Sequence, residues 1–189
     1  MAAIVDIINT ALAELGQTRV SSRDAATPGA QAIDSVFDAE LDLFLEEHPW
    51  NFAKARASLA RTASTPLFGF QYAYALPADF FAVWQEERPD MLYRIEGGKL
   101  LCDEEEVQLV YIRRVTTANE MPATFRDALA LRLAARVCRR VTGSDPGDKL
   151  LVRLDAAVRK SKFLNARNSG RQKPTRPDEL MRARAGRRS

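Results

Sequence analysis

Hydrophobic residues recur at three- and four-residue steps near the amino terminus, which is the period of an amphipathic helix. The first such stretch covers residues 3–15 and stops at Gly16, a common residue at a helix C-terminus. The second opens at Thr27-Pro28, where Thr can cap the helix and Pro suits its first position, and it stops at Pro49. This part of the chain therefore predicts two helices joined by a polar connection.

The same period returns towards the carboxyl terminus. One stretch begins at Pro122 and ends at Gly143, and small residues beside its apolar stripe would let another helix approach closely. Asp145-Pro146-Gly147 then repeats the opening seen at Thr27-Pro28, and the last apolar stripe runs to about Arg167. Two further helices are predicted, and we expect the four stripes to close one bundle.

Between these helices, residues 50–117 lose the helical period and become rich in aromatic residues, as short strands are. Gly97-Gly98 predicts a tight hairpin turn, because both positions can adopt positive φ, and residues 99–102 form the returning strand. Residues 107–115 carry apolar side chains on both faces. We expect a small antiparallel meander, with part of its aromatic surface left for a neighbouring subunit.

The predicted fold class is α+β: a mainly helical bundle of about four helices with an inserted small antiparallel β region and a basic C-terminal arm. Residues 1–50 and 120–167 form the two halves of the helical core, and residues 51–119 form the β-rich insertion. Residues 168–189 lack an apolar period, so they cannot bury enough surface to offset their ordering entropy. We expect them to be a disordered or extended arm in the isolated monomer.

Charge is distributed unevenly along the 189 residues, although the formal net charge is only +3. Residues 159–189 carry 11 Lys or Arg and 2 Asp or Glu, whereas the remaining residues carry 17 basic and 23 acidic side chains. An acidic body with a basic tail is therefore predicted. No apolar run approaches the roughly 20 residues of a membrane span, and the amino terminus lacks the basic start of a secretory signal, so no membrane partner is expected.

Reactive residues are few. Cys102 and Cys138 are the only thiols, His48 is the only histidine, and no phosphate-binding glycine motif occurs, so we expect no disulfide framework, metal or cofactor. Any catalytic triad would need His48, which we interpret as a helix-terminus residue. We interpret paired carboxylates such as Glu46 and Glu47 as solvated surface, and assign no catalytic residue.

The basic tail has three interpretations: docking onto an acidic protein surface, contact with nucleic-acid phosphates, and simple solubilisation. Leu180 and Met181 favour a protein groove, because apolar anchors add little to phosphate contact, and the lack of aromatic residues weakens base stacking. The candidate docking residues are Arg171, Lys173, Arg176, Leu180, Met181, Arg182, Arg184, Arg187 and Arg188.

Two sequence pieces, HPWNFA at residues 48–53 and YALPADF at residues 74–80, resemble the tail tubular protein A, or head-to-tail adaptor, family of short-tailed phages. An amino-terminal ALAELG helix, the Gly-Gly hairpin and an Ala/Leu/Arg-rich helix pair add to the resemblance, which covers roughly residues 4–164. The motif residues are His48, Pro49, Trp50, Asn51, Phe52, Tyr74, Leu76, Pro77 and Asp79.

The resemblance implies a non-enzymatic structural protein of the virion tail or neck, made in the host cytoplasm. Members of that family form a ring, commonly a dodecamer, beneath the portal protein. The ring extends the channel through which genomic DNA passes, and its far side meets a distal tail protein, either a nozzle or a tail tube. Their C-terminal segment often grips the portal, which is the role that the basic tail would take here.

Two other functions stay open on the sequence. One is a DNA-binding or DNA-packaging accessory protein that acts through the basic arm. The other is a cell-wall hydrolase that uses carboxylates such as Glu46 or Glu47.

Overall fold

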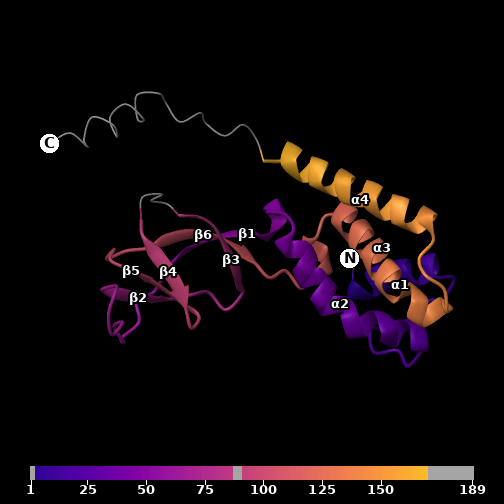
Figure 1. Ribbon diagram of the computed structural model, residues 1–189, viewed down its shortest axis with the longest axis horizontal. Helices are drawn as coiled ribbons and strands as arrows, with labels where there is room; N and C mark the ends of the chain where they lie inside the picture. Colours follow the sequence, from indigo (N-terminus) through magenta and orange to yellow (C-terminus); the bar gives the residue numbers. More distant parts are fainter. Residues whose placement is uncertain (1–2, 87–90, 170–189) are drawn as a thin grey trace.

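A computed structural model describes residues 3–86 and 91–169 of the chain (Figure 1). Within these residues, α-helices gather at one end of the molecule and strands at the other. The elements are α1 (Ile4–Glu14), α2 (Pro28–Glu46), η1 (Asn51–Ala53), β1 (Lys54–Ser58), β2 (Tyr72–Ala75), β3 (Phe80–Glu86), β4 (Tyr93–Glu96), β5 (Lys99–Cys102), β6 (Gln108–Arg113), η2 (Ala118–Glu120), α3 (Ala123–Thr142) and α4 (Asp148–Arg167). The fold class is therefore α+β, as predicted.

Helix α3 is the centre of the helical end, because α1, α2 and α4 all pack against it. Its sequence mixes large aliphatic side chains with alanines, so that neighbouring helices can approach from several sides. The buried residues of α3 are Phe125, Ala128, Leu129, Ala130, Leu131, Leu133, Ala134, Val137 and Cys138. Within α4, in contrast, Ser161 alone is buried, and this helix lies on the outside of the molecule (Figure 1). Most of the α4 surface is therefore open to contact.

Several predicted helix ends are confirmed. Gly16 ends α1 with a φ of 67°, a left-handed conformation that favours glycine. The Thr27 hydroxyl accepts a hydrogen bond from the backbone N–H of Ala30 at 3.4 Å and so caps α2. Gly143 ends α3 with a φ of 76°, and its N–H donates to the Arg139 carbonyl oxygen at 3.0 Å.

The predicted opening of the last helix at Asp145 is wrong. Helix α4 begins at Asp148, and Gly147 precedes it without any side-chain cap. The Asp145 carboxylate instead forms an ion pair with Arg139 of the preceding helix, at 3.7 Å. Both side chains of this pair are largely exposed, so it contributes little to stability, and nothing in the structure explains why α4 begins three residues later than the sequence predicts.

The strands form two antiparallel three-stranded sheets, ordered β1-β6-β3 and β2-β5-β4. The predicted hairpin is confirmed, because Gly97 and Gly98, with φ of 54° and 74°, join β4 to β5. The prediction of one meander is wrong, since β6 lies between β1 and β3 rather than at the end of a sequential series. A strand with apolar residues on both faces buries more of them in a central position than at an edge.

Strand β6 belongs to two hydrophobic cores. Ile112 packs into the core of the helical end, whereas Leu109 and Tyr111 pack into a second core among the strands. Just after β6, the Arg114 guanidinium binds the Asp42 carboxylate of α2 with both Nε and Nη2, at 2.6 and 3.1 Å. This bidentate contact fixes the sheet end against α2.

No helix among the described residues is long and apolar enough to cross a membrane.

Candidate docking site at the end of helix α4

An aromatic cluster fills the turn that follows α2. The Trp50 ring is buried and lies edge-on to Phe44 and Phe125, with ring centroids 5.1 and 4.9 Å away. Its indole N–H donates to the Phe44 carbonyl oxygen at 2.8 Å, so the polar atom of this buried ring is satisfied. Phe52 packs edge-on against Phe125 at 4.8 Å. The cluster thereby fixes the direction in which the chain leaves Pro49.

Asn165, in the last turn of α4, binds this same segment with both ends of its side-chain amide. Its Oδ1 accepts from the backbone N–H of Asn51 at 2.7 Å, and its Nδ2 donates to the Pro49 carbonyl oxygen at 3.3 Å. Nδ2 also lies 2.9 Å from Nε2 of His48. The Asn51 side chain donates in return to the Asn165 carbonyl oxygen at 2.7 Å and to Ser169 Oγ at 2.9 Å. These hydrogen bonds, which we call the Asn165 clamp, tie the end of α4 to the end of α2.

His48 acts in the clamp as a neutral hydrogen-bond acceptor. Burial, with the nearby ammonium groups of Lys162 and Lys54, holds the pKa of His48 below its ordinary value. A neutral imidazole whose Nε2 is unprotonated can accept from the Asn165 amide, which has two N–H groups to share between His48 and Pro49. The arrangement agrees with the structural interpretation of His48 at a helix terminus.

A charged network lies beside the clamp, on the surface between α2 and α3. Glu40 is 5% exposed, and its carboxylate binds Arg132 Nε at 2.8 Å and Arg136 Nε at 3.2 Å. Arg132 also binds Glu47, which pairs in turn with Lys162 of α4 at 3.7 Å. The guanidinium of Arg132 therefore neutralises one buried carboxylate and links α3 to the residue that follows α2.

The second motif, YALPADF, forms the corner between the two sheets. Tyr74 on β2 is buried, and its hydroxyl donates to the Glu104 carbonyl oxygen at 2.6 Å. Asp79, just before β3, accepts from the Tyr111 hydroxyl at 3.0 Å. Pro77 and the half-buried Leu76 lie between them, and the Pro77 carbonyl oxygen accepts from the N–H of the residue that opens β3. The Tyr74 hydroxyl and the Asp79 carboxylate thus both have structural partners.

The predicted docking residues themselves, Arg171 to Arg188, lie outside the described residues. The described residues end at Ser169, which contacts Asn51 within the Asn165 clamp. The motif residues at 48–52 and the C-terminal end of α4 are thus neighbours in space, a relation that the sequence alone did not reveal.

The residues considered for catalysis, Glu46 and Glu47, do not line any of the four pockets that the described residues form between β1 and β6, between α1 and α3, between α2 and α4, and beside the β4–β5 hairpin. Glu46 is exposed on the surface, and Glu47 is engaged with Arg132 and Lys162. Cys102 and Cys138 are both buried thiols, and burial raises the pKa of Cys102. Within the described residues, no group of three or more His, Cys, Asp or Glu side chains could hold a metal ion.

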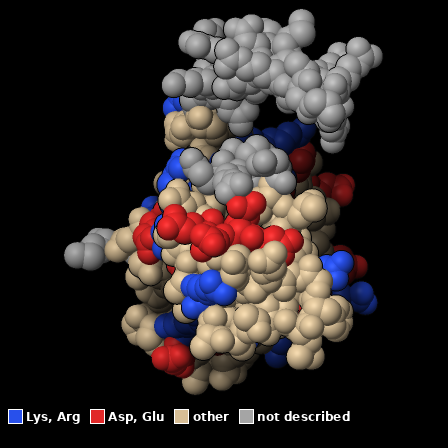
Figure 2. All heavy atoms as spheres, turned by 90° about the vertical axis from the view of Figure 1, so that its left-hand side faces the viewer, with Lys and Arg blue, Asp and Glu red and all other residues tan. Residues whose placement is uncertain are grey.

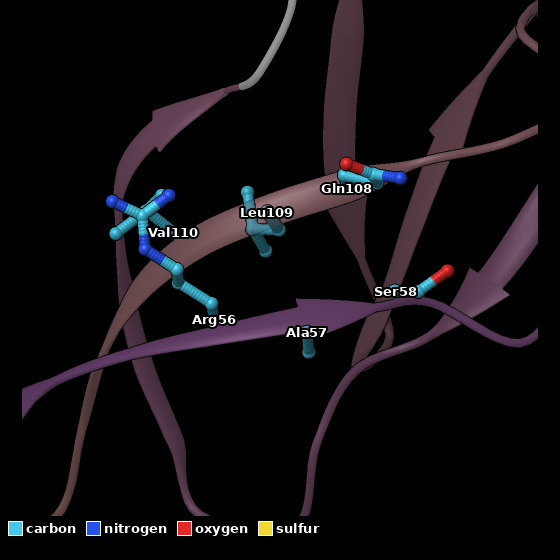
Figure 3. Close-up of a pocket in the computed structure, with 6 residues that line it drawn as sticks. All are labelled: Arg56, Ala57, Ser58, Gln108, Leu109 and Val110. Atoms are coloured by element: carbon cyan, nitrogen blue, oxygen red, sulfur yellow. The ribbon is translucent and has the colours of Figure 1, made fainter.

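A small pocket of about 180 Å³ lies where β1 and β6 pair (Figure 3). Arg56 stands beside Val110 at one end, and Ser58 and Gln108 lie at the other. The six lining residues include no carboxylate, imidazole or thiol, so they supply no acid–base pair for a reaction.

Asn165 and Glu40 are the site residues that the sequence analysis did not find. Asn165 stands in a charged stretch of helix, and its main partners are more than 110 positions away. Glu40 is one of five acidic residues in α2, and the sequence does not indicate which of these five carboxylates is buried in the fold. The Thr27 cap was recognisable because its partner is three residues away.

Replacing Asn165 with alanine is expected to lower the free energy of unfolding by about 1–3 kcal/mol, because the half-buried Asn51 N–H loses its acceptor. Urea denaturation measures this loss, and hydrogen exchange at the Asn51 amide should become faster. Asn168→Ala, a matched change at an exposed residue, is expected to cost less than about 0.5 kcal/mol. Equal losses for the two variants would contradict the clamp.

The lowered pKa of His48 predicts a pH dependence of stability. Near the ordinary histidine pKa of about 6.5, the unfolded chain binds more protons at this position than the native chain does. The free energy of unfolding should therefore fall as the pH drops from neutral through this range, and His48→Gln should flatten that part of the profile. Urea denaturation over a pH series measures the slope, and an unchanged slope in the variant would contradict the assignment.

No model of a known protein family matches this chain, and no curated protein matches it.

Proposed function

We propose that this chain is a structural head-to-tail adaptor of a short-tailed phage virion and not an enzyme. Its helical bundle carries an inserted β region and a basic C-terminal arm, and copies of it form a ring that joins the portal protein to the distal tail protein. Genomic DNA passes through the lumen of this ring. The proposal begins from the resemblance of residues 48–53 and 74–80 to that family.

The observation that carries the proposal is the Asn165 clamp. It fixes the end of α4 through Asn51 and His48, which belong to the motif of the resemblance. The basic arm that follows α4 is therefore attached at a fixed point on each copy in the ring. Once the arm of one copy has bound the portal, the arms of the other copies are held close to it, so each of them binds at a high effective concentration. Arms of modest individual affinity on one ring would then hold a portal firmly.

The surface of the sheet end supports passage of DNA without adhesion. Figure 2 shows this end, where Asp and Glu side chains form a band across the described surface. The connection between β5 and β6 supplies the exposed acidic residues Asp103, Glu105 and Glu106. Carboxylates repel phosphates, so an acidic lining lets DNA slide rather than bind.

Deletion of residues 170–189 tests the portal contact. We expect the truncated chain to keep its fold, because the Asn165 clamp remains, and to bind portal rings at least about tenfold more weakly, a loss of about 1.4 kcal/mol. Surface-immobilised portal measures the affinity, and circular dichroism checks the fold. Unchanged affinity would contradict the role of the arm.

Two full-length variants separate the chemistry of that contact. Leu180→Ser with Met181→Ser removes the apolar anchors, whereas Arg182→Ser with Arg184→Ser removes two charges from the same segment. A larger loss for the first pair indicates a protein groove, and a larger loss for the second indicates an acidic surface.

The second candidate function is DNA binding through the same arm. It is favoured by the exposed basic residues Arg159, Lys160 and Arg167, which lead along α4 towards the arm. A steep loss of duplex affinity between low and moderate salt would support it. Absence of binding at low salt would remove it.

A further inference from the structure

A groove lies at the helical end between α2 and α4, which both pack on α3. Its volume is about 630 Å³, whereas one water in the liquid occupies about 30 Å³, so bulky side chains fit within it. Leu43 of α2 and Leu151 of α4 line it and are 46% and 44% exposed, and Val158 adds further apolar surface. We call it the α2–α4 groove, and its exposed leucines favour an apolar occupant.

The charged residues that line the groove already have partners. Glu40 binds Arg132 and Arg136, at 2.8 and 3.2 Å. Asp155 forms an ion pair with Arg159 of the same helix. The lining thus holds two carboxylates and two guanidinium groups, with no excess of either sign. An occupant therefore has to bring apolar side chains rather than a particular net charge.

The chain has one segment that can supply such side chains. Residues 1–2, 87–90 and 170–189 lie outside the described residues. The first two segments have too few residues to fill a groove of this size. The third contains Leu180 and Met181, which are the only sizeable aliphatic residues of the basic arm.

The last described residue, Ser169, lies on the groove side of α4. Its Oγ accepts from the side chain of Asn51, which follows α2, at 2.9 Å. Helical backbone continues to Asn168, and Ser169 comes 18 positions after Leu151, which is about five helical turns. Ser169 and Leu151 therefore lie along one side of α4, the side that faces α2.

The arm is long enough to return to the groove. At about 1.5 Å per residue, Val158 and Leu151 lie about 17 and 27 Å from Ser169 along the axis of α4. Leu180 follows Ser169 by 11 positions, and that length of extended chain spans about 36 Å. Leu180 and Met181 can therefore reach the whole length of the groove, with a margin for a reversal of direction.

The arm of the same chain is favoured over the arm of a second copy. A short covalent connection keeps a binding segment near its site at a high effective concentration. The arm alone cannot bury enough surface to offset its ordering entropy. The groove offers it apolar surface that exists only after the three helices have packed.

We propose that Leu180 and Met181 of the C-terminal arm dock into the α2–α4 groove of their own chain before assembly. The same two residues are the apolar anchors for the portal, so the groove and the portal compete for one segment. The contact within the chain thereby holds the arm back until a portal ring is present. This regulatory part rests on the proposed function, whereas the contact itself does not.

Disulfide formation within the full-length chain tests the contact. Leu151→Cys with Met181→Cys, the groove pair, places one thiol in the groove and one on the arm. Val152→Cys with Met181→Cys is the control pair. Val152 is the next residue along α4 and does not line the groove, and it is 66% exposed, so accessibility alone favours the control pair. Both natural cysteines are buried, and circular dichroism checks that the variants fold.

In a glutathione buffer at low micromolar protein, the intramolecular disulfide of the groove pair should be at least tenfold more stable than that of the control pair. Non-reducing electrophoresis measures both. Equal stability would overturn the proposal. A disulfide-linked dimer as the main product of the groove pair would also overturn it, because the arm would then fill the groove of a second copy.

The apolar anchor is tested within the groove pair. Leu180→Ser removes the remaining anchor, so it should lower the stability of the disulfide to about that of the control pair. Arg188→Ser changes the arm beyond the anchors and should leave that stability unchanged. A preference for the groove that survives Leu180→Ser would overturn the role of the anchors.

Portal binding separates the contact from the proposed function. The oxidised groove pair should bind immobilised portal rings at least tenfold more weakly than the same chain after reduction. Equal affinities would overturn the competition between groove and portal. A reduced chain without affinity for portal would contradict the adaptor function, and the disulfide preference would still support the contact within the chain.

Discussion

Replacing Trp50 with alanine is expected to lower the free energy of unfolding by about 3–5 kcal/mol, the range for large aromatic residues truncated in a core. The substitution removes a buried ring that contacts Phe44 and Phe125, and it leaves the Phe44 carbonyl oxygen without the indole donor. Because that cluster also directs the segment that holds Asn165, the loss should be accompanied by faster hydrogen exchange at the end of α4. Guanidinium denaturation measures the free energy.

Trp84→Ala is the matched control, because the only other tryptophan is 40% exposed. Its ring has a cation–π contact with Lys54, whose ammonium nitrogen lies 4.0 Å from the ring centroid. Loss of such a contact is expected to cost about 1 kcal/mol or less. Comparable losses at positions 50 and 84 would contradict the central place of the aromatic cluster.

Replacing Arg132 with leucine is expected to lower the free energy of unfolding by about 3 kcal/mol, the lower end of the range for breaking a buried ion pair. Glu40 is then left in a buried position with only Arg136, which is itself largely exposed. Burial of an incompletely paired carboxylate is what destabilises the variant. Denaturation at neutral pH, where the carboxylate is ionised, gives the largest effect.

The double variant Glu40→Leu with Arg132→Leu should recover part of that loss, because the buried carboxylate is gone, the Arg136 guanidinium that it leaves is largely exposed to water, and the two leucines can pack together. The difference between the single and double variants measures the coupling of the pair. Arg140→Leu, on an exposed position of the same helix, is the control and should change stability by less than about 0.5 kcal/mol. A double variant that is less stable than Arg132→Leu alone would contradict the argument.

Features whose partners lie a few residues away were predictable from the sequence. The Thr27 cap, the glycine ends of α1 and α3, and the Gly97-Gly98 hairpin all follow from local backbone conformation and from nearby hydrogen bonds. Two features were predicted wrongly, the start of α4 and the order of the strands. Asp145 favours a cap by its position but pairs with Arg139, and β6 leaves sequential order because both of its faces are apolar.

The candidate site was predictable only in part, for the same reason. The motif residues 48–52 stood out, but nothing near them in the sequence indicates that Asn165 completes their hydrogen bonds.

By itself, the sequence determined the α+β class, the helical segments, the hairpin and the contrast between an acidic body and a basic tail, because periodicity, turn chemistry and charge are written in neighbouring residues. Tertiary structure alone decided the strand order, the Asn165 clamp and the pairing of Glu40. These features join residues that are far apart in the chain, and their energies depend on burial and distance, which exist only once the chain has folded.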